Sequence, residues 1–482
     1  MKRLFCVLAV VMAVLATACS SQQETLVFLS TNDMHAKIQR FPMLATAVQQ
    51  CRDTTDMVIL TDAGDRWTGN AYVDLAEEIG APMIELMNKL KFDVATLGNH
   101  EFDHGQAHLG KMIQRMNCDV VCANCLSDTS SFPQLDPYVI IERGDLKIGV
   151  VGAVTNYEGG DRPAGLKESF VGVRFPDPQE TSAKYSKELK DKCDLVVLLS
   201  HMGDDRDQEL LERKISDFDL VLSGHTHKLV DTVVNNVPLN QAYKDLHYLG
   251  VTKVTFNKKT KEVERIEYSR VKMEDYAANP EFQAEVDKYY DNAELNKAVG
   301  EFSAKAEKIG LANWIAKSMA QKAKADIGVY HFGGVRLDGF EKGGISTAMI
   351  YDLEPFGTGV VKVKMTPEAL RKMIIEKYND TENRKESHRI DLFMTASYVL
   401  VTDVNDTARD VQFPTLTPHH KYTVALPDYV YKNYHAIEAT DAEILKGVHV
   451  NQLLLEVLEK EKSITPDNAH LQRKVVTKLL ID

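Results

Sequence analysis

Short runs of apolar residues recur through the first half of the chain and predict buried strands. In chain order these runs are LVFLS, MVILT, DVATL, DVVCA, KIGVVGAV, DLVVLLS and DLVLS. Such nearly continuous apolar runs are typical of strands that are covered on both faces. Between the runs, the stretches EEIGAPMIELMNKLKF and KYSKELKDKC have the spacing of amphipathic helices. This alternation predicts a layered α/β domain over residues 24–275.

A second alternating region lies beyond a polar stretch of the chain. Residues 228–273 have the pattern of hairpin strands that close the first domain. Residues 276–298 are rich in charge and permit a helix, which favours a linker helix over a core element. Apolar runs resume with LANWIAKSMA, and we expect a smaller α/β domain over residues 299–482.

The N-terminal residues have the pattern of a processing signal. Lys2 and Arg3 precede the apolar run LFCVLAVVMAVLATA, which is too short to span a bilayer comfortably. Cys19 follows this run and precedes the polar stretch SSQQE. The order resembles the lipobox of bacterial lipoproteins, in which the cysteine becomes the lipidated first residue of the mature chain. A plain signal peptide that is cut near residues 16–18 is the alternative.

We favour the lipoprotein, with residues 1–19 as its signal peptide. A lipid on Cys19 is then its only contact with the membrane of the bacterial cell envelope, where the protein is periplasmic or surface-exposed. We expect the wild-type protein to fractionate with membranes and the Cys19→Ala variant to be soluble, because that variant lacks the lipid anchor. Cell fractionation tests this expectation, and equal solubility of the two forms would contradict it.

Charge and thiols narrow the classes of partner. The net charge of −13 argues against a nucleic-acid polymer, because gripping a phosphate backbone needs a basic surface. A bound phosphate ester needs local positive charge instead, and metal ions can provide it. Five cysteines follow Cys19, and an odd number is a poor disulfide framework. The single Cys-x-x-Cys lacks a second pair at zinc spacing, so Cys118 and Cys122 are expected to be small core residues.

Residue types that bind metals follow the ends of five predicted strands. They are Asp33 and His35, Asp65, Asn99, His201, and His225 with His227. An isolated Gly-Asp is more often a turn, and a lone histidine is more often a satisfied core residue. Ligands of α/β sheets, however, bind beyond the carboxyl ends of strands, and every candidate lies at such an end. The conjunction therefore favours a single metal site over unrelated residues.

The donor types indicate which ions would bind. Carboxylate, amide and imidazole groups without a thiolate suit divalent ions of the Mn, Zn, Fe or Co class. Seven donors exceed what one tetrahedral ion takes, so we expect two divalent metal ions bridged by a carboxylate. Such a pair would clamp a phosphoryl group and generate hydroxide at neutral pH.

In this order, the motifs resemble those of the calcineurin-like metallophosphoesterases. The matching pieces are Asp33-x-His35, Gly64-Asp65, Gly98-Asn99-His100-Glu101, His201 and Gly224-His225-x-His227. The longer strings TNDMHAKI, TLGNHEFDHG and SGHTH are similar to the 5′-nucleotidase / UDP-sugar hydrolase / 2′,3′-cyclic-nucleotide phosphodiesterase family. The resemblance implies a four-layer αββα sandwich for the first domain and a 5′-nucleotidase-like substrate domain for the second.

The resemblance also implies a role for individual residues. The implied ion ligands are Asp33, His35, Asp65 and His227 for one ion, and Asp65, Asn99, His201 and His225 for the other. His100 and Asp103 match the catalytic dyad of the family, in which a cationic group meets the charge on the phosphoryl or leaving oxygen. Glu101 has no matching role, and we expect it to be local scaffolding.

The second domain resembles the family less closely. The segments HFGGVR and EPFGTG imply that Arg336 binds substrate and that the ring of Phe356 stacks on a base. A surface ion pair and core packing are the respective structural alternatives. Tyr429 is the candidate for a second stacking aromatic. His331 stands where the family usually has asparagine, and we count it among the substrate-binding residues.

Other departures leave the substrate open. Lys305 and Lys308 replace two arginines, and a lysine cannot hold a phosphate bidentately. The family's Gly-Gly-Asp-Gly loop is absent as well.

Taken together, the motifs predict an extracytoplasmic phosphoesterase. We expect a metal-bridging hydroxide to attack phosphate monoesters, with nucleoside 5′-phosphates as the first choice of substrate. UDP-sugars, 2′,3′-cyclic nucleotides and a non-nucleotide phosphate ester are the alternative small-molecule substrates. A surface binding lipoprotein with a vestigial site is the alternative of another class, and the intact ligand set argues against it.

Overall fold

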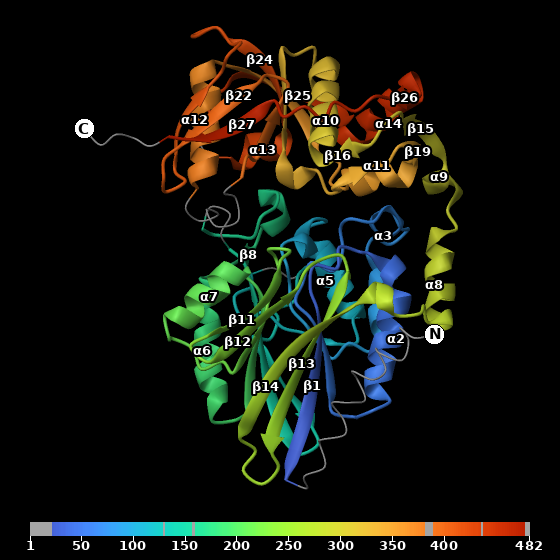
Figure 1. The fold of residues 1–482 in the computed structure, drawn as a ribbon, viewed down its shortest axis with the longest axis vertical. Coiled ribbons are helices and arrows are strands. Elements are labelled where there is room, and N and C mark those ends of the chain that lie inside the picture. Colours follow the sequence, from blue (N-terminus) through green and yellow to red (C-terminus); the bar gives the residue numbers. More distant parts are fainter. Residues whose placement is uncertain (1–21, 129–130, 157–159, 381–388, 435–436, 478–482) are drawn as a thin grey trace, which may run out of the picture.

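Two six-stranded sheets form the centre of the first domain in this computed structural model, which describes residues 22–128, 131–156, 160–380, 389–434 and 437–477 (Figure 1). The order of the first sheet is β14 (Val263–Lys272), β13 (Tyr248–Asn257), β1 (Gln23–Thr31), β2 (Val58–Asp62), β3 (Val94–Ala95) and β4 (Asp119–Val120). The order of the second sheet is β11 (Leu229–Val234), β12 (Val237–Ala242), β10 (Leu220–Leu222), β9 (Leu195–His201), β7 (Leu146–Val154) and β6 (Tyr138–Arg143).

Helices cover the outer face of each sheet. The helices over the first sheet are α2 (Phe41–Arg52), α4 (Ala81–Leu90), α5 (Gln106–Arg115) and α8 (Pro280–Tyr290). Those over the second sheet are α6 (Pro178–Lys190) and α7 (Asp204–Glu212). Smaller elements are α3 (Ala71–Asp74) and the strand pair β5 (Leu126–Ser127) and β8 (Val173–Arg174). The layers confirm the expected αββα sandwich.

The apolar runs are nearly continuous because the strands of both sheets are buried on both faces. In β1, Leu26 and Phe28 join the core between the two sheets, whereas Val27 and Leu29 pack against the helices. Strand β9 alternates in the same way between the inter-sheet core and α6 with α7. Successive side chains of a strand point to opposite faces, so a strand buried on both sides needs an apolar residue at nearly every position.

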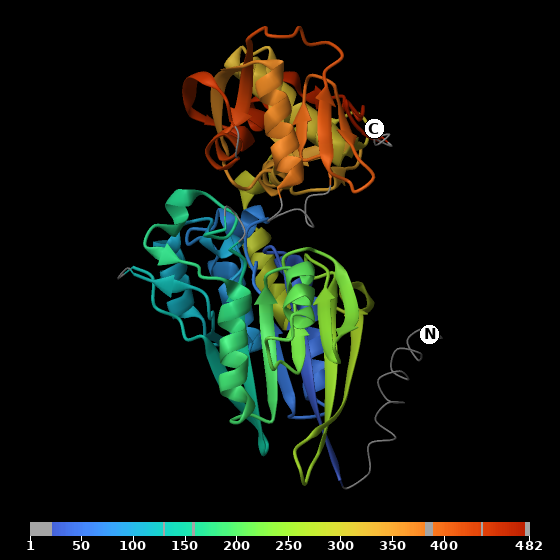
Figure 2. The same cartoon turned by 90° about the vertical axis from the view of Figure 1, so that its left-hand side faces the viewer.

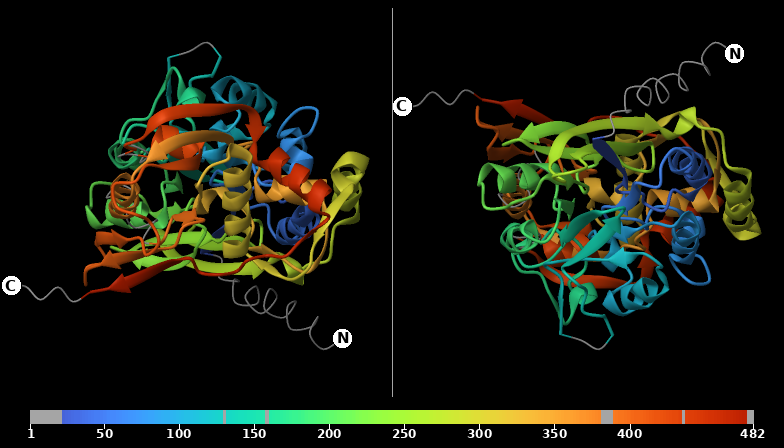
Figure 3. Two further views of the ribbon diagram at one scale, coloured as in Figure 1. Left: turned by 90° about the horizontal axis from the view of Figure 1, so that it is seen from above. Right: turned by 90° about the horizontal axis from the view of Figure 1, so that it is seen from below.

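Parallel pairing brings the ends of the central strands together. Strands β1, β2, β3 and β4 are parallel neighbours, and so are β7, β9, β10 and β12. Their carboxyl ends face the second domain, which lies over this edge of the sandwich (Figures 1 and 2). Viewed along the long axis of the molecule, the second domain covers the first (Figure 3).

A five-stranded sheet forms the centre of the second domain. Its order is β21 (Leu392–Met394), β17 (Ile327–His331), β24 (Tyr422–Pro427), β20 (Gly359–Met365) and β25 (Thr440–His449). The smaller sheets contain β19 (Gly343–Ser346), β15 (Ala298–Phe302) and β26 (Ser463–Ile464); β23 (Ala408–Gln412), β22 (Tyr398–Thr402) and β27 (Gln472–Val476); and β16 (Ala306–Glu307) with β18 (Gly339–Phe340). The helices are α10 (Lys308–Ala323), α11 (Thr347–Leu353), α12 (Pro367–Asn379), α13 (Asp428–Asn433) and α14 (Val450–Glu461).

The segment expected to be a linker helix forms two helices, α8 and α9 (Ala293–Asn296), before β15 begins. Helix α8 is more than a connection, because Phe282 and Val286 are buried in the core of the first domain. The polar composition of the segment concealed this packing, since only one face of α8 is apolar.

Direct contacts join the two domains on both sides of their interface. On one side, the backbone N–H of Ala71 in α3 donates to Asp352 of α11 at 2.7 Å. On the other side, Arg162 donates to the side-chain oxygen of Asn433 at 3.2 Å, and Lys432 pairs with Glu168 at 3.3 Å.

None of the helices that the structure describes combines the length and the apolar character needed to cross a membrane. Cys19 and the rest of the expected signal peptide lie outside the described residues. Cys122 is buried and Cys118 packs against the same core, and the cysteines of the described ranges are free thiols.

Candidate metal centre and active site

Loops at the carboxyl ends of the parallel strands bring the predicted ligands together. Two groups of donor atoms each lie within 4.8 Å of one another. The first group is Asp33, His35, Asp65 and His227, and the second is Asp65, His201 and His225. Asp65 belongs to both groups, as a bridging ligand requires. Asn99 follows β3 at the same edge and lines the adjoining cavity.

The ligand loops have an unusual backbone. Positive φ angles occur at Asp33 (48°), His35 (44°), Asp65 (53°), His225 (82°) and His227 (56°). Residues with a side chain adopt this region at a cost, and such residues cluster at functional sites. The folded chain therefore stores local strain at five of the seven expected ligands.

Two glycines allow the ligand loops to approach each other. A Cβ on Gly98 would lie 2.5 Å from the backbone nitrogen of Asp65, and one on Gly64 would lie 2.5 Å from the backbone nitrogen of Gly98. Any larger residue at either position would push the loops that carry Asp65 and Asn99 apart.

Several buried polar atoms of the site suit a bound cation. Asn99 Oδ1 finds no hydrogen-bond partner among the residues that the structure describes, and His201 Nε2 faces the Asp65 carboxylate at 3.2 Å. The Nε2 atoms of His35 and His227 face each other at 2.9 Å. Buried polar atoms such as Asn99 Oδ1 are rarely left without a partner, and a divalent ion would take the lone pair of that oxygen and of each deprotonated imidazole nitrogen. The residues at this site therefore fit divalent metal ions.

Ionisation states also suit metal binding. Burial opposes the charge on Asp65, but His201 and His100 outweigh burial and hold the pKa of Asp65 well below its usual value. Burial and the nearby Arg336 guanidinium lower the pKa of His35 well below its usual value. Burial also lowers the pKa of His227. An anionic carboxylate and neutral imidazoles are the forms that bind metals.

His201 carries a proton when no ion is bound. Burial lowers its pKa, but the Asp65 carboxylate at 3.2 Å opposes burial, and the net effect raises the pKa to about 10. The Nδ1 atom of His201 donates to the carbonyl oxygen of Ala63 at 2.7 Å, which leaves Nε2 to face Asp65. An ion that binds here must displace this proton, so its affinity falls at low pH.

The expected catalytic dyad forms a direct contact. His100 Nδ1 and Asp103 Oδ2 are 2.8 Å apart, on a single 3-10 turn that begins at His100. Burial lowers the pKa of His100, but Asp103 and Asp65 outweigh it and the pKa is raised. The backbone N–H of His100 also donates to Asp65 Oδ1 at 2.8 Å. The dyad is thus held against the carboxylate that the two ligand groups share.

Glu101 points away from the cavity into a buried ionic cluster. Its carboxylate accepts hydrogen bonds from the backbone N–H groups of Asp65, Arg66 and Gly98. The Arg66 guanidinium contacts Asp62 at 3.0 Å and Glu101 at 3.8 Å, and all three side chains are fully buried. Glu101 therefore clamps the two loops that carry Asp65 and Asn99, in agreement with its expected scaffolding role.

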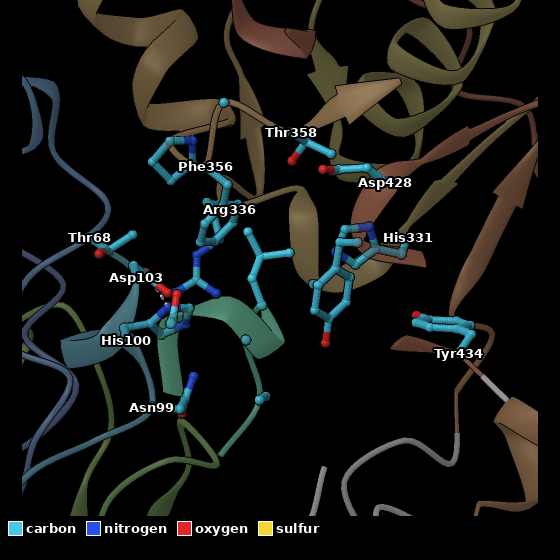
Figure 4. Close-up of a pocket in the computed structure, with 18 of the residues that line it drawn as sticks. Thr68, Asn99, His100, Asp103, His331, Arg336, Phe356, Thr358, Asp428 and Tyr434 are labelled. Carbon is cyan, nitrogen blue, oxygen red and sulfur yellow. Dashed lines mark hydrogen bonds and ion pairs between the residues drawn. The ribbon is translucent and has the colours of Figure 1, made fainter. Parts of the chain in front are cut away.

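A cavity of about 330 Å³ opens beside the metal ligands, between the two domains (Figure 4). Arg336 reaches across the interface, and its Nη2 lies 3.3 Å from Nε2 of His35. The ring of Phe356 stacks on His100 with centroids 5.7 Å apart and planes inclined by 22°. The structure thus brings Arg336 and Phe356, two of the four expected substrate residues, to the expected catalytic dyad.

His331 and Tyr429 lie deeper on the second-domain side of the cavity. Their rings stack at 5.0 Å with an inclination of 28°, so His331 covers one face of Tyr429. Burial lowers the pKa of His331 to about 4, which makes the imidazole neutral. Lys305 pairs with Glu341 at 2.7 Å and Lys308 lies over the ring of Phe332 at 4.0 Å, and neither lysine lines the cavity.

Sequence reasoning missed several residues of the cavity. The first domain contributes Ala164, Gly165, Leu166 and Ser169, and the second contributes Thr358, Lys377, Arg389, Asp391, Asp428 and Tyr434. The string RPAGL carried one usable signal, because it lies in a loop between β7 and α6 and so follows a strand that ends at the same edge. Thr358 lies within the EPFGTG segment that carries Phe356, but no role was expected for it.

Comparisons with known proteins agree with these observations. Residues 26–229 match the family model of calcineurin-like phosphoesterases, and residues 285–441 match the model of the 5′-nucleotidase C-terminal domain. The chain is 27% identical over 415 residues to the trifunctional nucleotide phosphoesterase protein YfkN of Bacillus subtilis, which covers 74% of this chain but 28% of that protein. It is 26% identical over 428 residues to a 5′-nucleotidase of Vibrio cholerae. That alignment covers 73% of this chain and 76% of the Vibrio cholerae protein.

Solved structures share the fold. A 5′-nucleotidase precursor from Thermus thermophilus superposes with a TM-score of 0.81 at 20% identity, over 94% of this chain and 99% of that one.

Proposed function

Because the chain belongs to the calcineurin-like phosphoesterases that carry a 5′-nucleotidase C-terminal domain, a family of metal-dependent enzymes, we propose that it is a two-metal phosphatase of nucleoside 5′-phosphates. One observation carries this proposal. Two groups of metal-binding donors share Asp65 and adjoin the cavity into which the second domain extends Arg336 and Phe356.

The metal ligands divide between two ions. Asp33, His35, Asp65 and His227 would hold the first, and Asp65, His201 and His225 the second. Asn99, whose Oδ1 has no hydrogen-bond partner among the described residues, would complete the second set. When bound, two such ions supply positive charge for the phosphoryl oxygens and lower the pKa of the attacking water.

The remaining residues bind substrate and handle charge. His100 uses Nδ1 for Asp103, which leaves Nε2 to donate to a phosphoryl or leaving oxygen. Arg336, beside the metal ligands, offers a fixed cation to the phosphoryl group. The exposed side of the Phe356 ring offers a surface for a nucleobase, and neutral His331 offers a ring nitrogen for a hydrogen bond.

A substrate panel tests this proposal. The purified protein, with and without a chelator, is offered AMP, UDP-glucose, 2′,3′-cyclic AMP and an aryl phosphate. We expect AMP to be cleaved with the highest kcat/KM, and chelation to abolish release of phosphate because the ions supply the charge and the nucleophile. Activity that survives chelation, or no cleavage of any compound, refutes the proposal.

A non-nucleotide phosphate ester is the second candidate substrate. His331 favours this candidate, because its ring stacks on one face of Tyr429. That face of Tyr429 is then unavailable for stacking on a nucleobase. In the same panel, efficient cleavage of the aryl phosphate with poor cleavage of AMP would select this candidate.

Replacement of Phe356 tests recognition of the base. We expect Phe356→Ala to raise KM for AMP by about 10- to 100-fold, because stacking of a base on an aromatic ring contributes about 1–3 kcal/mol. Ribose 5-phosphate lacks a base, so its KM is expected to stay unchanged. Phe356→Tyr retains the ring and serves as the matched control. An equal rise in KM for both compounds would show that Phe356 acts on something other than the base.

We also propose an extracytoplasmic, lipid-anchored location. The support is the sequence pattern that ends at Cys19, and the fractionation of the Cys19→Ala variant tests it.

A further inference from the structure

A buried carboxylate that the chemistry above does not use lies behind two of the histidine ligands. Asp207 is in α7, on the outer face of the second sheet (Figure 1), and is fully buried. One of its oxygens accepts a hydrogen bond from the hydroxyl of Ser200 at 2.6 Å, and the other accepts one from the hydroxyl of Ser223 at 2.5 Å. A single carboxylate therefore bridges two neighbouring strands.

These two serines adjoin the ligands of the same ion. Ser200 immediately precedes His201 in β9, and Ser223 comes two residues before His225, just after β10. The parallel register of β9 and β10 ends with Leu199 opposite Leu222. Ser200 and Ser223 are thus the first residues beyond that register, and the Asp207 carboxylate connects the chains at this point.

Both serine hydroxyls are held by further contacts. The Ser200 oxygen accepts from the backbone N–H of Met202 at 3.1 Å, and the Ser223 oxygen accepts from the Gln241 side-chain amide at 3.3 Å. Each hydroxyl thus donates one hydrogen bond and accepts another, so its orientation is fixed. A displacement of Asp207 would therefore shift the ends of both strands.

Burial of the Asp207 carboxylate costs free energy of folding. Burial, together with the nearby Asp204 and Asp205 carboxylates, raises its pKa to about 7, and the two serine hydroxyl groups oppose this rise by stabilising the charged form. No cation pairs with it among the ion pairs of the described residues. A carboxylate that destabilises the fold in this way, with no cation beside it, is expected to have a specific role in positioning its neighbours.

We propose that Asp207 is a positioning residue that sets the separation of His201 and His225 and thereby the affinity for the second ion. It acts through Ser200 and Ser223 and does not touch the ion. The inference rests on the proposed two-ion function. Groups that orient metal ligands typically change metal affinity by about 10- to 100-fold when they are removed.

Calorimetric titration of the chelator-stripped, full-length protein with Mn²⁺ tests this inference. We expect the wild type to bind two ions and Asp207→Ala to weaken one of the two sites by about 10- to 100-fold without changing the other. Asp207→Asn retains an acceptor and a donor for the two serines, so it is expected to restore most of the lost affinity. Glu212→Gln, an acid-to-amide change at an exposed position of the same helix, is the control and is expected to bind as the wild type does.

Melting of the metal-free variants separates positioning from simple core packing. If Asp207→Ala binds both ions like the wild type, or if both sites weaken alike with a lower Tm, the inference is wrong. Should that variant not fold, Ser200→Ala and Ser223→Ala each remove one hydroxyl, and the same selective loss is expected of them. Fewer than two ions on the wild type would instead overturn the two-ion function itself, which distinguishes the two failures.

Discussion

His100→Ala is expected to lower kcat for the preferred phosphate ester by about 10²- to 10⁴-fold, the usual contribution of a positioned acid or base. The variant should still bind both ions, because the metal ligands do not include the imidazole of His100. Steady-state kinetics combined with metal analysis of the same sample measures both quantities. Loss of a metal ion along with activity would mean that His100 supports the ligands and is not a catalytic residue.

Two further variants control this result. His247→Ala makes the same substitution at an exposed position of the first domain, and its kcat should match that of the wild type. Asp103→Asn keeps the shape of the dyad but removes the charge that raises the pKa of His100. If protonated His100 is the active form, the alkaline limb of the pH–rate profile moves to lower pH in Asp103→Asn. An unmoved limb would contradict the role of the dyad.

Glu101→Ala is expected to destabilise the metal-free first domain by about 3–5 kcal/mol, the cost of breaking a buried ion pair. Its removal leaves the Arg66 guanidinium with one buried carboxylate partner, Asp62. Three backbone N–H groups, including that of Asp65, lose their acceptor as well. Denaturant unfolding of the transition that contains the first domain measures the change.

Glu142→Ala removes an exposed acid from the same domain and provides the matched control, with an expected change within about 0.5 kcal/mol. A loss of less than about 1 kcal/mol for Glu101→Ala would show that the cluster relaxes or admits water, and the clamp on the ligand loops would then be weak.

The metal ligands were predictable because each one follows a local pattern. A residue placed directly after a buried apolar run must emerge at the end of that strand, and parallel strands bring such ends to one edge. The expected donors follow β1, β2, β3 and β10, or, in the case of His201, end β9. The family resemblance then divided them into two sets. The geometry gathers Asp33, His35, Asp65 and His227 in one group and Asp65, His201 and His225 in the other, and Asn99 belongs to neither group.

Features that depend on distant contacts were not predictable in the same way. Nothing in the polar segment that forms α8 indicates which element it packs against. Phe282 and Val286 of this helix are nevertheless buried in the core of the first domain. Nothing near Tyr429 in the chain shows that His331 stacks on it, because the two residues belong to elements far apart in the sequence and only the fold of the second domain joins them.

The sequence by itself determined which strand ends carry metal donors, since alternation, turn residues and motif spacing act over a few neighbouring residues. Only the tertiary structure decided what faces those donors. Arg162 and Asn433 are 271 residues apart, and contacts of this kind place the RPAGL loop of the first domain opposite Phe356 and Tyr429. Each such contact is weak alone and leaves no local signature, so the domain arrangement and the substrate cavity emerge only from the sum of many contacts in the folded molecule.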